Sequence, residues 1–299
     1  MSIAREVRLL RHGRDWRGRA VVPRSARPWA PAREPQEFPT AWARTPTARA
    51  ARAMFRAAVM KPLMRVETDL ELHGLDLLDE APAPAVFVAN HGSHLDTPLM
   101  LSSLPPRFAH RTAVAAATDY FFDVRWRALA TAFAFNTFPV ERRGSRGSLD
   151  LAEALLSEGW SLLVFPEGTR TKDGWMRRFR LGAALLCRTF DVPAVPVAVR
   201  GSYAAMPRGL SWPRRGRRPV AVRFGGPLMP TDGESLGAFG VRLEEQVARL
   251  WVEHDVGWWG SLRADDRRAR TRGPDAAHWR RVWETTRPPA REQDRVWPR

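Results

Sequence analysis

Residues 85–96 read AVFVANHGSHLD, an apolar run that gives way to a short polar turn. The apolar part ends at Asn90, and Thr97 and Pro98 open an apolar helical pattern just beyond the turn. Proline is well tolerated in the first turn of a helix because its missing N–H has no partner there. A strand, a tight turn and a helix in succession are typical of a parallel α/β sheet. The pattern therefore predicts that His91 lies at the carboxyl end of a strand, where open α/β sheets bind their ligands.

The same alternation of strands and helices extends on both sides of this stretch. The apolar patterns predict strands over residues 66–74, 83–90, 112–118, 135–142, 161–165, 192–199 and 220–227. They predict helices over residues 97–104, 123–135, 148–159, 181–190 and 235–254. We therefore expect an α/β fold, a single domain over residues 47–256 with a mostly parallel central sheet flanked by helices. Because proline cannot donate to a ladder, Pro193 and Pro196 predict an irregular strand beside the site.

The two ends of the chain lack this regular pattern. Residues 1–46 are rich in Arg, Pro and Trp, and we expect a basic irregular arm. Residues 257–299 form an Arg- and Trp-rich tail. Two interpretations of the tail are open, since its tryptophans suit the headgroup region of a bilayer and also suit docking across the domain.

A separate amphipathic pattern begins at Thr47, where residues 48–64 read ARAARAMFRAAVMKPLM. Its apolar residues follow one helical stripe, with three arginines among them. Such a helix can lie in a membrane interface, or it can pack on the domain with its arginines extending outward to solvent.

The charge of the chain calls for an anionic partner. Its 299 residues hold 48 Lys plus Arg against 32 Asp plus Glu, a formal net charge of +16. Residues 1–50 contain 11 arginines and 4 acidic residues, and residues 261–299 contain 11 arginines and 6 acidic residues. The excess therefore lies mainly outside the predicted domain, where it suits attachment to anionic lipid better than chemistry.

Cysteine use and hydropathy bear on the compartment. The single cysteine, Cys187, excludes an internal disulfide and a cysteine zinc cluster, and its apolar neighbours predict a buried thiol. We find no signal-peptide pattern and no run of 18 apolar residues. We expect a cytoplasmic protein associated peripherally with the inner face of the cell membrane.

His91 and Asp96 form the first candidate catalytic pair. Residues five apart lie about 140° apart on a helix, so a turn must bring the two side chains together. In that geometry Asp96 accepts one ring N–H, fixes the tautomer and leaves the other ring nitrogen as a base. Alternatively, Asp96 only caps the helix and His91 is a polar loop residue. His91 and His94 lack further ligands at a recognisable spacing, so we expect no metal site.

Two further motifs carry polar residues at strand ends. Glu167, Gly168, Thr169 and Arg170 follow an apolar strand and offer a carboxylate, a close backbone approach, a hydroxyl and a guanidinium. These groups suit a phosphorylated acceptor, whereas the alternative is a surface turn with a local ion pair. The segment FPVERRG, residues 138–144, ends in Arg142 and Arg143, either of which would face a phosphate.

Four blocks in order, NHGSHLD, FPVERRG, FPEGTR and VPAVPV, resemble the glycerolipid acyltransferases typified by 1-acylglycerol-3-phosphate acyltransferase. The resemblance covers roughly residues 66–230. It implies acyl transfer from acyl-CoA or acyl carrier protein to a lysophospholipid hydroxyl, most simply giving phosphatidic acid. It also implies that no cofactor is needed beyond the acyl donor.

The resemblance assigns roles to individual residues. His91 matches the general base and Asp96 its orienting partner, and Arg142 matches the arginine of the second block. Residues 167–170 match the acceptor-binding block. Pro139 departs from the family pattern, and two adjacent arginines leave the choice between Arg142 and Arg143 open.

Other functions remain as alternatives. One alternative keeps the acyltransferase class and changes the acceptor to glycerol-3-phosphate, another lysophospholipid or a glycolipid. Another alternative lies outside that class: the protein is not catalytic and binds nucleic acid or an acidic membrane through its Arg-rich segments. Residues 214–218, RRGRR, are one such segment. Since no helix-turn-helix, zinc-finger or aromatic RNA-binding pattern accompanies the charge, we expect an anionic membrane surface as partner and no nucleic acid.

Overall fold

The computed structural model describes residues 39–118, 125–141 and 146–287, which all belong to one compact unit that begins at Pro35. The strands are β1 Thr68–His73, β2 Val86–Ala89, β3 Thr112–Ala117, β4 Thr137–Val140, β5 Ser161–Val164, β6 Ala194–Arg200 and β7 Arg218–Phe224. The helices are η2 Ala41–Arg44, α2 Pro46–Phe55, η3 Arg56–Met60, α3 Lys61–Glu67, α4 Asp76–Asp79, α5 Asp96–Ser103, α6 Pro106–Ala109, α8 Arg125–Phe135, α9 Arg146–Ser157, α10 Gly182–Phe190, α11 Ser202–Ala205, α12 Leu236–Arg263, α13 Arg267–Arg272 and α14 His278–Thr286.

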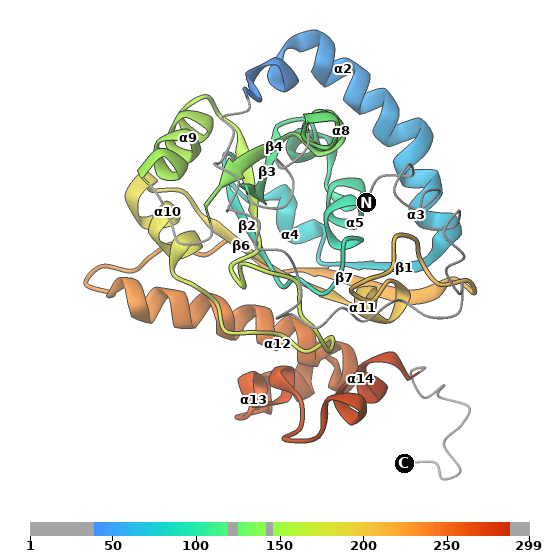
Figure 1. The fold of residues 1–299 in the computed structure, drawn as a ribbon. Helices are drawn as coiled ribbons and strands as arrows, with labels where there is room; N and C mark the ends of the chain where they lie inside the picture. Colours follow the sequence, from blue (N-terminus) through green and yellow to red (C-terminus); the bar gives the residue numbers. More distant parts are fainter. Residues whose placement is uncertain (1–38, 119–124, 142–145, 288–299) are drawn as a thin grey trace, which may run out of the picture. The chain divides into compact units, whose positions relative to one another are not determined.

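The strands form one seven-stranded sheet in the order β1-β7-β6-β2-β5-β3-β4 (Figure 1). Every neighbouring pair is parallel except β6 and β7. Helices cover both faces of the sheet, as a parallel sheet requires. The predicted α/β fold with a mostly parallel sheet is confirmed.

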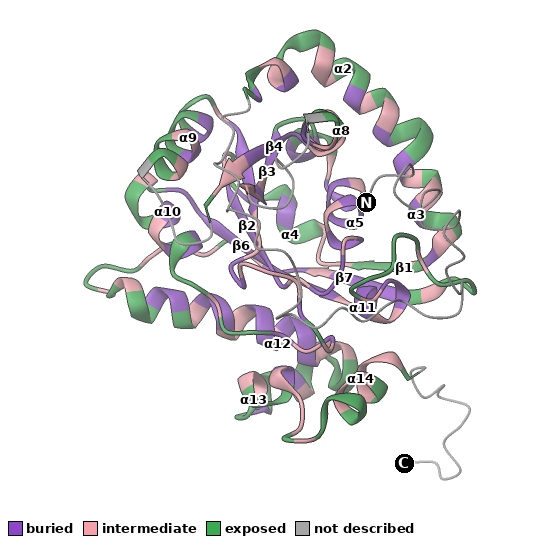
Figure 2. Ribbon diagram, viewed as in Figure 1, coloured by how far each residue is buried: buried purple, intermediate pink, exposed green. Residues whose placement is uncertain are grey.

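The core has two halves, one on each face of the sheet. Alternate residues of β2 enter different halves, because successive side chains of a strand point to opposite faces. Phe87 packs on the α5 side with Leu99, and Val86 and Val88 pack on the side of α9, α10 and α12. Figure 2 shows this buried centre in purple. All four residues of β2 are buried, so the strand that leads to His91 is held from both sides.

Cys187 lies in the second half of the core, as predicted. Its side chain is buried on α10, and burial raises the pKa of the thiol to about 12. The thiol is therefore protonated at neutral pH, and such a buried thiol is a poor nucleophile.

Strand β6 corrects one expectation from the sequence. Despite Pro196 it is a regular central strand between β7 and β2. The carbonyl of Pro196 accepts the N–H of Gly225, one residue beyond the end of β7. A strand residue directs its N–H and C=O to the same side, so the missing N–H of Pro196 faces the end of β7. The ladder between β6 and β2 therefore loses no hydrogen bond.

The N-terminal helical segment, α2 to α3, buries two of its arginines instead of extending them to solvent. Arg52 donates from Nε to the carbonyl of Phe133, in the last turn of α8, at 2.7 Å. Arg56 donates to the carbonyl of Ala109, the last residue of α6. Both guanidinium groups therefore meet the partial negative charge at a helix C-terminus. Burial, together with the neighbouring arginines, lowers the pKa of Arg52 to about 10, so it remains charged at neutral pH.

The outward side of the same segment is partly apolar. Met54 is 72 % exposed, and Val59 and Val66 are also exposed. Trp126 and Leu129 are exposed on α8, which packs against α2. We call these five side chains the α2–α8 apolar surface. Within the described residues, no helix is both long enough and apolar enough to cross a membrane.

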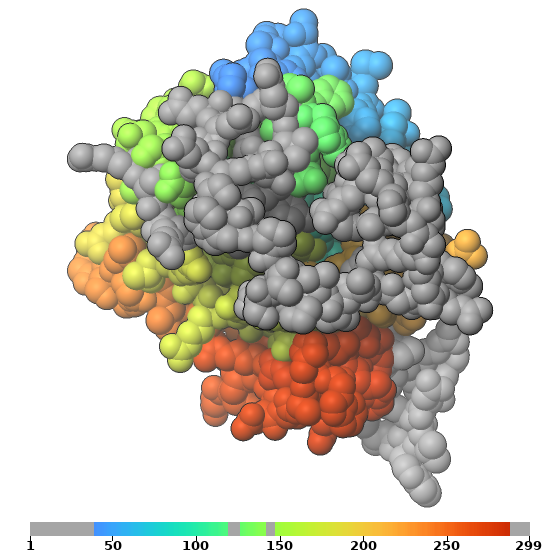
Figure 3. Space-filling view, viewed as in Figure 1, coloured from blue at the N-terminus to red at the C-terminus, as the bar shows by residue number. Residues whose placement is uncertain are grey.

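The C-terminal region packs on the rest of the unit. The predicted boundary between residues 256 and 257 falls inside α12, at a kink where Gly257 has a φ of 72°. Helix α13 packs on α12, and α14 packs on α11. In Figure 3 these helices are red and lie against the yellow-green part of the chain. Of the two interpretations of the tail, docking across the domain agrees with these contacts.

Candidate active site

The candidate site lies at the carboxyl ends of β2 and β5. These strands are parallel neighbours, with Val88 opposite Val164. Their chains therefore leave the sheet at the same edge, which brings the loop after Ala89 beside the loop after Val164. Each loop carries one of the motifs that the sequence singles out.

His91 and Asp96 meet as the predicted turn requires. The Nδ1 of His91 lies 2.8 Å from Oδ2 of Asp96, whose side chain is fully buried. Because the carboxylate only accepts, Nδ1 carries the proton and Nε2 is left as the basic nitrogen. The same Oδ2 accepts the N–H of Ser93 at 2.8 Å. Asp96, the first residue of α5, thus orients the imidazole and stabilises the turn before the helix, and neither of these hydrogen bonds caps α5.

The His91 ring is also fixed from the other loop. It stacks on Phe165, with ring centroids 4.1 Å apart and planes tilted by 20°. Phe165 is the first residue after β5. The carboxylate of Asp96 and the ring of Phe165 together restrict the imidazole to one orientation.

Glu167 joins the two loops instead of facing a ligand. Its Oε1 accepts the N–H of His91 at 2.8 Å and its Oε2 accepts the N–H of Arg177 at 3.1 Å. Only 3 % of the residue is exposed, and it does not line the cavity described below. Burial raises the pKa of its carboxyl to about 8, although both hydrogen bonds act to lower it. Both oxygens accept main-chain N–H groups, so this geometry gives no support to the expectation that Glu167 binds an acceptor directly.

Two residues that hold the His91 turn were not singled out by the sequence. Asn90 donates to the carbonyl of Val199 at 2.9 Å and accepts its N–H at 2.7 Å, which ties the end of β2 to β6. The hydroxyl of Ser93 donates to the carbonyl of Met206 at 2.7 Å. The sequence did contain a signal for Asn90: it is a polar residue at the end of a fully apolar run. A buried amide must find hydrogen-bond partners.

A cavity of about 480 Å³ opens beside His91. One part of its wall is polar and basic, formed by His91, His94, Gly168, Thr169, Arg170, Arg180 and Arg208. The other part is mainly apolar, formed by side chains of β3, β4, β5, α9 and α10, with Glu141 and Ser148 as its polar members. Gly168, Thr169 and Arg170 thus lie where the sequence predicts, whereas Arg142 and Arg143 fall outside the described residues. Arg180 and Arg208 are additional cations that the sequence did not indicate.

Gly168 is needed for close approach at this wall. Its φ is +71°, and a Cβ there would lie 3.1 Å from Nε of Arg180. The guanidinium of Arg180 therefore passes directly over the loop, which a larger residue would disturb. Burial and, to a smaller extent, the charge of Arg170 lower the pKa of His94 to about 4, so His94 is neutral at physiological pH.

A larger hollow, of about 1050 Å³, lies near the C-terminal helices. Gly92 lines it, but His91 and the arginines of the smaller cavity do not. Among the described residues, no group of three or more His, Cys, Asp and Glu is placed to hold a metal ion. The chemistry of the side chains therefore favours the smaller cavity, where an oriented base, several guanidinium groups and an apolar wall meet.

Comparison with known proteins finds acyltransferases. Residues 69–200 match the family described as Acyltransferase. A chloroplastic 1-acyl-sn-glycerol-3-phosphate acyltransferase of Brassica napus is 31 % identical over 46 % of this chain and 39 % of its own. The alpha form of that enzyme from Homo sapiens is 34 % identical over 40 % of this chain and 41 % of its own. The chain thus spans about two fifths of the length of these relatives.

A solved structure is also similar. The crystal structure of the 1-acyl-sn-glycerophosphate acyltransferase PlsC from Thermotoga maritima matches with a TM-score of 0.50 and 26 % identity. The match covers 68 % of this chain and 82 % of that one. The matched family region contains His91, Asp96 and the loop after β5, and it ends before α11.

Proposed function

We propose that the protein transfers an acyl group from a thioester donor to the free hydroxyl of a lysophospholipid, because residues 69–200 match the family described as Acyltransferase. The acceptor proposed is 1-acyl-glycerol-3-phosphate, and the product is phosphatidic acid. The observation that carries the proposal is the His91–Asp96 pair beside a cavity with one basic and one apolar wall. An acceptor with both a phosphate and a hydroxyl suits the basic wall, and an acyl chain suits the apolar wall.

The residues at this site support direct transfer. Nε2 of His91 takes the proton of the acceptor hydroxyl while its oxygen attacks the thioester carbonyl carbon. The C–O bond forms, the C–S bond breaks, and the leaving thiolate receives the proton from His91. Asp96 stabilises the imidazolium between these two transfers. The donor is acyl-CoA or acyl carrier protein, and the proposal requires no further cofactor.

The basic wall predicts a preference for phosphorylated acceptors. A guanidinium–phosphate hydrogen bond contributes about 1.5–3 kcal/mol, which corresponds to at least a tenfold effect. We expect kcat/KM for 1-acyl-glycerol-3-phosphate to exceed that for monoacylglycerol by at least about tenfold. We expect Arg170→Gln to reduce this ratio, whereas Arg188→Gln, on the outer side of α10, leaves it unchanged.

A panel of acceptors with purified protein and a labelled acyl-CoA measures this ratio. Equal rates with and without the phosphate would contradict the assigned basic wall. Faster transfer to glycerol-3-phosphate, to another lysophospholipid or to a glycolipid would keep the reaction class and replace the acceptor. The same panel run with acyl carrier protein identifies the donor.

A lipid acceptor also requires contact with a membrane, and we propose that the α2–α8 apolar surface provides it. We expect Met54→Ser combined with Val59→Ser to lower binding to vesicles of phosphatidylglycerol and phosphatidylcholine by at least about tenfold, because a fully buried apolar side chain contributes about 1.5–3 kcal/mol and these two are buried in part. Val241→Ser, which removes an exposed valine on α12, is the control. Vesicle co-sedimentation measures the effect. Loss of binding only in Trp279→Ser with Trp283→Ser would transfer this role to α14.

A further inference from the structure

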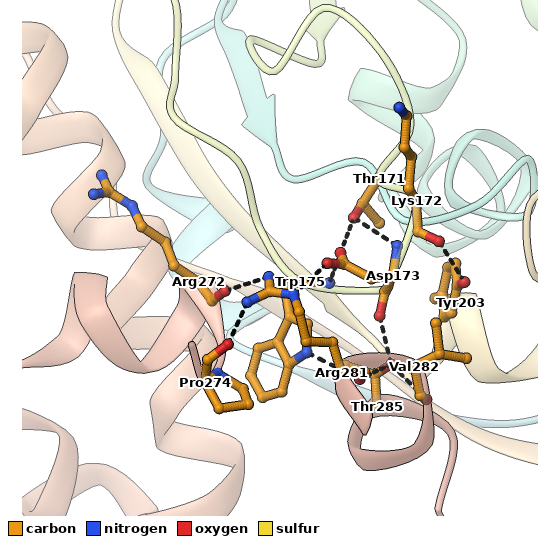
Figure 4. A network of polar contacts seen from close by, with 10 residues as sticks. All are labelled: Thr171, Lys172, Asp173, Trp175, Tyr203, Arg272, Pro274, Arg281, Val282 and Thr285. Atoms are coloured by element: carbon orange, nitrogen blue, oxygen red, sulfur yellow. Dashed lines mark hydrogen bonds and ion pairs between the residues drawn. The ribbon is translucent and has the colours of Figure 1, made fainter. Parts of the chain in front are cut away.

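A partly buried ion pair joins the C-terminal helices to the loop that follows the acceptor block. Arg281, on α14, donates from Nε to Oδ2 of Asp173 at 2.6 Å (Figure 4). Its other nitrogens donate to the carbonyl of Arg272, the last residue of α13, and to the carbonyl of Pro274, between α13 and α14. One guanidinium therefore fixes the turn between α13 and α14 and also binds the loop that follows the acceptor block.

Asp173 passes this restraint toward His91. Its Oδ1 accepts the hydroxyl of Thr171 at 2.9 Å and the N–H of Trp175 at 3.3 Å. The N–H of Thr171 in turn donates to the main-chain carbonyl of His91 at 2.9 Å. Burial acts to raise the pKa of Asp173, but the hydrogen bonds from Arg281, Thr171 and Trp175 outweigh it, and the pKa is lowered. The carboxylate thus stays charged while it holds both the loop and α14.

Additional contacts make the interface specific. The hydroxyl of Thr285 donates to the carbonyl of Asp173 at 2.6 Å, and Nε1 of Trp175 donates to the carbonyl of Arg281 at 3.1 Å. Gly174 has a φ of +89°, and a Cβ there would lie 2.6 Å from Oγ1 of Thr285. A side chain at Gly174 would therefore separate the loop from α14.

The loop also has supports besides α14: Met176 is buried in a core cluster with residues of α12, and its N–H donates to the carbonyl of Thr271 on α13 at 2.9 Å. Between β5 and α10 it forms no helix or strand. Glu167 accepts the N–H of Arg177, which closes the loop from inside. The hydroxyl of Tyr203 donates to the carbonyl of Lys172 at 2.7 Å. The contacts from α14 hold the same loop from outside.

We propose that α13 and α14 are a positioning element for the loop of residues 167–177, with Arg281 as its central positioning residue. Arg281 acts through Asp173 and Thr171 on the main chain of His91, and it touches neither substrate. The effect on catalysis rests on the proposed acyl transfer. Because residues 168–170 line the basic wall and other elements line the apolar wall, the element affects the acceptor more than the donor.

The test uses the full-length protein and two readouts. Hydrogen–deuterium exchange of peptides that cover residues 168–177 reports the loop without any substrate. Steady-state kinetics report KM for 1-acyl-glycerol-3-phosphate and for acyl-CoA separately. The variants are Arg281→Ala, Arg281→Lys and Thr285→Val, and the matched control is Arg280→Ala, which removes an exposed arginine of the same helix paired with Glu284.

We expect Arg281→Ala to speed exchange in the loop at least tenfold and to raise the acceptor KM about tenfold, the scale of one lost charged hydrogen bond. The donor KM should change less than twofold. In Arg281→Lys the exchange rate and the acceptor KM should lie between the wild-type and Arg281→Ala values, because lysine keeps a cation beside Asp173. Thr285→Val removes one hydroxyl with little change in volume, and it provides the same comparison if Arg281→Ala does not fold.

Three results would overturn the proposal. Unchanged exchange in folded Arg281→Ala and Thr285→Val would show that α14 does not hold the loop. Equal effects of Arg280→Ala would show that the exchange reports the helix as a whole. Faster exchange with an unchanged acceptor KM would remove the functional role. If the wild-type protein transfers no acyl group, the exchange readout still decides whether α14 restrains the loop, so the two proposals fail separately.

Discussion

His91→Ala lowers kcat for acyl transfer by about 10²–10⁴-fold, the contribution typical of a positioned general base. The reason is that Nε2 of His91 is the basic nitrogen that the pairing of Nδ1 with Asp96 leaves at the cavity. An unassisted hydroxyl keeps its proton and attacks a thioester slowly. Product formation from labelled acyl-CoA measures the loss.

A second substitution separates the chemistry from the packing. His91→Ala leaves the buried carboxylate of Asp96 with one hydrogen bond fewer, a change that lowers stability by itself. In His91→Asn the amide N–H takes the position of Nδ1–H and keeps the partner of Asp96, but no base is present. We expect both variants to lose activity and His91→Asn to retain the wild-type melting temperature within a few degrees. A kcat within tenfold of the wild-type value in folded His91→Asn would rule out the base.

Glu167→Gln changes how the stability of the protein depends on pH. Burial raises the pKa of Glu167 to about 8 from an ordinary value of 4.5. Between these values the folded protein holds a proton that the unfolded chain has released, so the free energy of unfolding decreases as pH rises from about 5 to 8. Glutamine does not titrate, and the variant lacks this contribution.

The same substitution also disturbs the hydrogen bonds at every pH. Glutamine offers one acceptor oxygen where the N–H groups of His91 and Arg177 need two, and its NH₂ group opposes one of them. An unsatisfied buried donor costs about 1–3 kcal/mol. We therefore expect Glu167→Gln to be less stable than the wild-type protein at pH 5, and the difference to shrink or reverse by pH 8.

Urea unfolding of both proteins at several pH values measures this difference, in which the titration of all other groups cancels. Glu153→Gln, on the outer side of α9, is the control because Glu153 is exposed. A difference between wild-type and Glu167→Gln that stays constant from pH 5 to pH 8 would contradict the raised pKa.

Local patterns in the sequence predict most of the fold. Each predicted strand and helix corresponds to one in the structure, because apolar periodicity and strand-to-helix turns are local properties. The spacing of His91 and Asp96 left two interpretations open, and the resemblance to the acyltransferases favoured the pair, whose atoms lie 2.8 Å apart in the structure. The prediction for Pro196 was wrong, because the cost of a missing N–H depends on which neighbour it faces.

Features that depend on distant segments could not be predicted. One of the two interpretations of the N-terminal helix extended its arginines to solvent, but Arg52 meets a helix C-terminus 81 residues away in sequence. Glu167 has the chemistry of a ligand-binding residue, and only the fold brings two main-chain donors to its oxygens. The ion pair of Arg281 with Asp173 joins residues 108 apart. No local pattern specifies such contacts, because they arise from how the elements pack.

The charge of the chain now has several physical roles. Arg52 and Arg56 stabilise helix ends inside the structure, and Arg281 holds a loop. Arg170 and Arg180 line the cavity. The role of each of these arginines depends on its position in the structure, and the net charge of +16 does not indicate it. Substitution of any of them should have a specific effect that a general loss of positive charge does not reproduce.

The most direct test of the central claim is mass-spectrometric analysis of the products that the purified wild-type protein forms from 1-acyl-glycerol-3-phosphate and labelled acyl-CoA on lipid vesicles. We predict labelled phosphatidic acid with the new acyl group on the free glycerol hydroxyl, in an amount equal to the free CoA released. Free CoA with labelled fatty acid and no phosphatidic acid, or no reaction with any acceptor of the panel, would contradict the account.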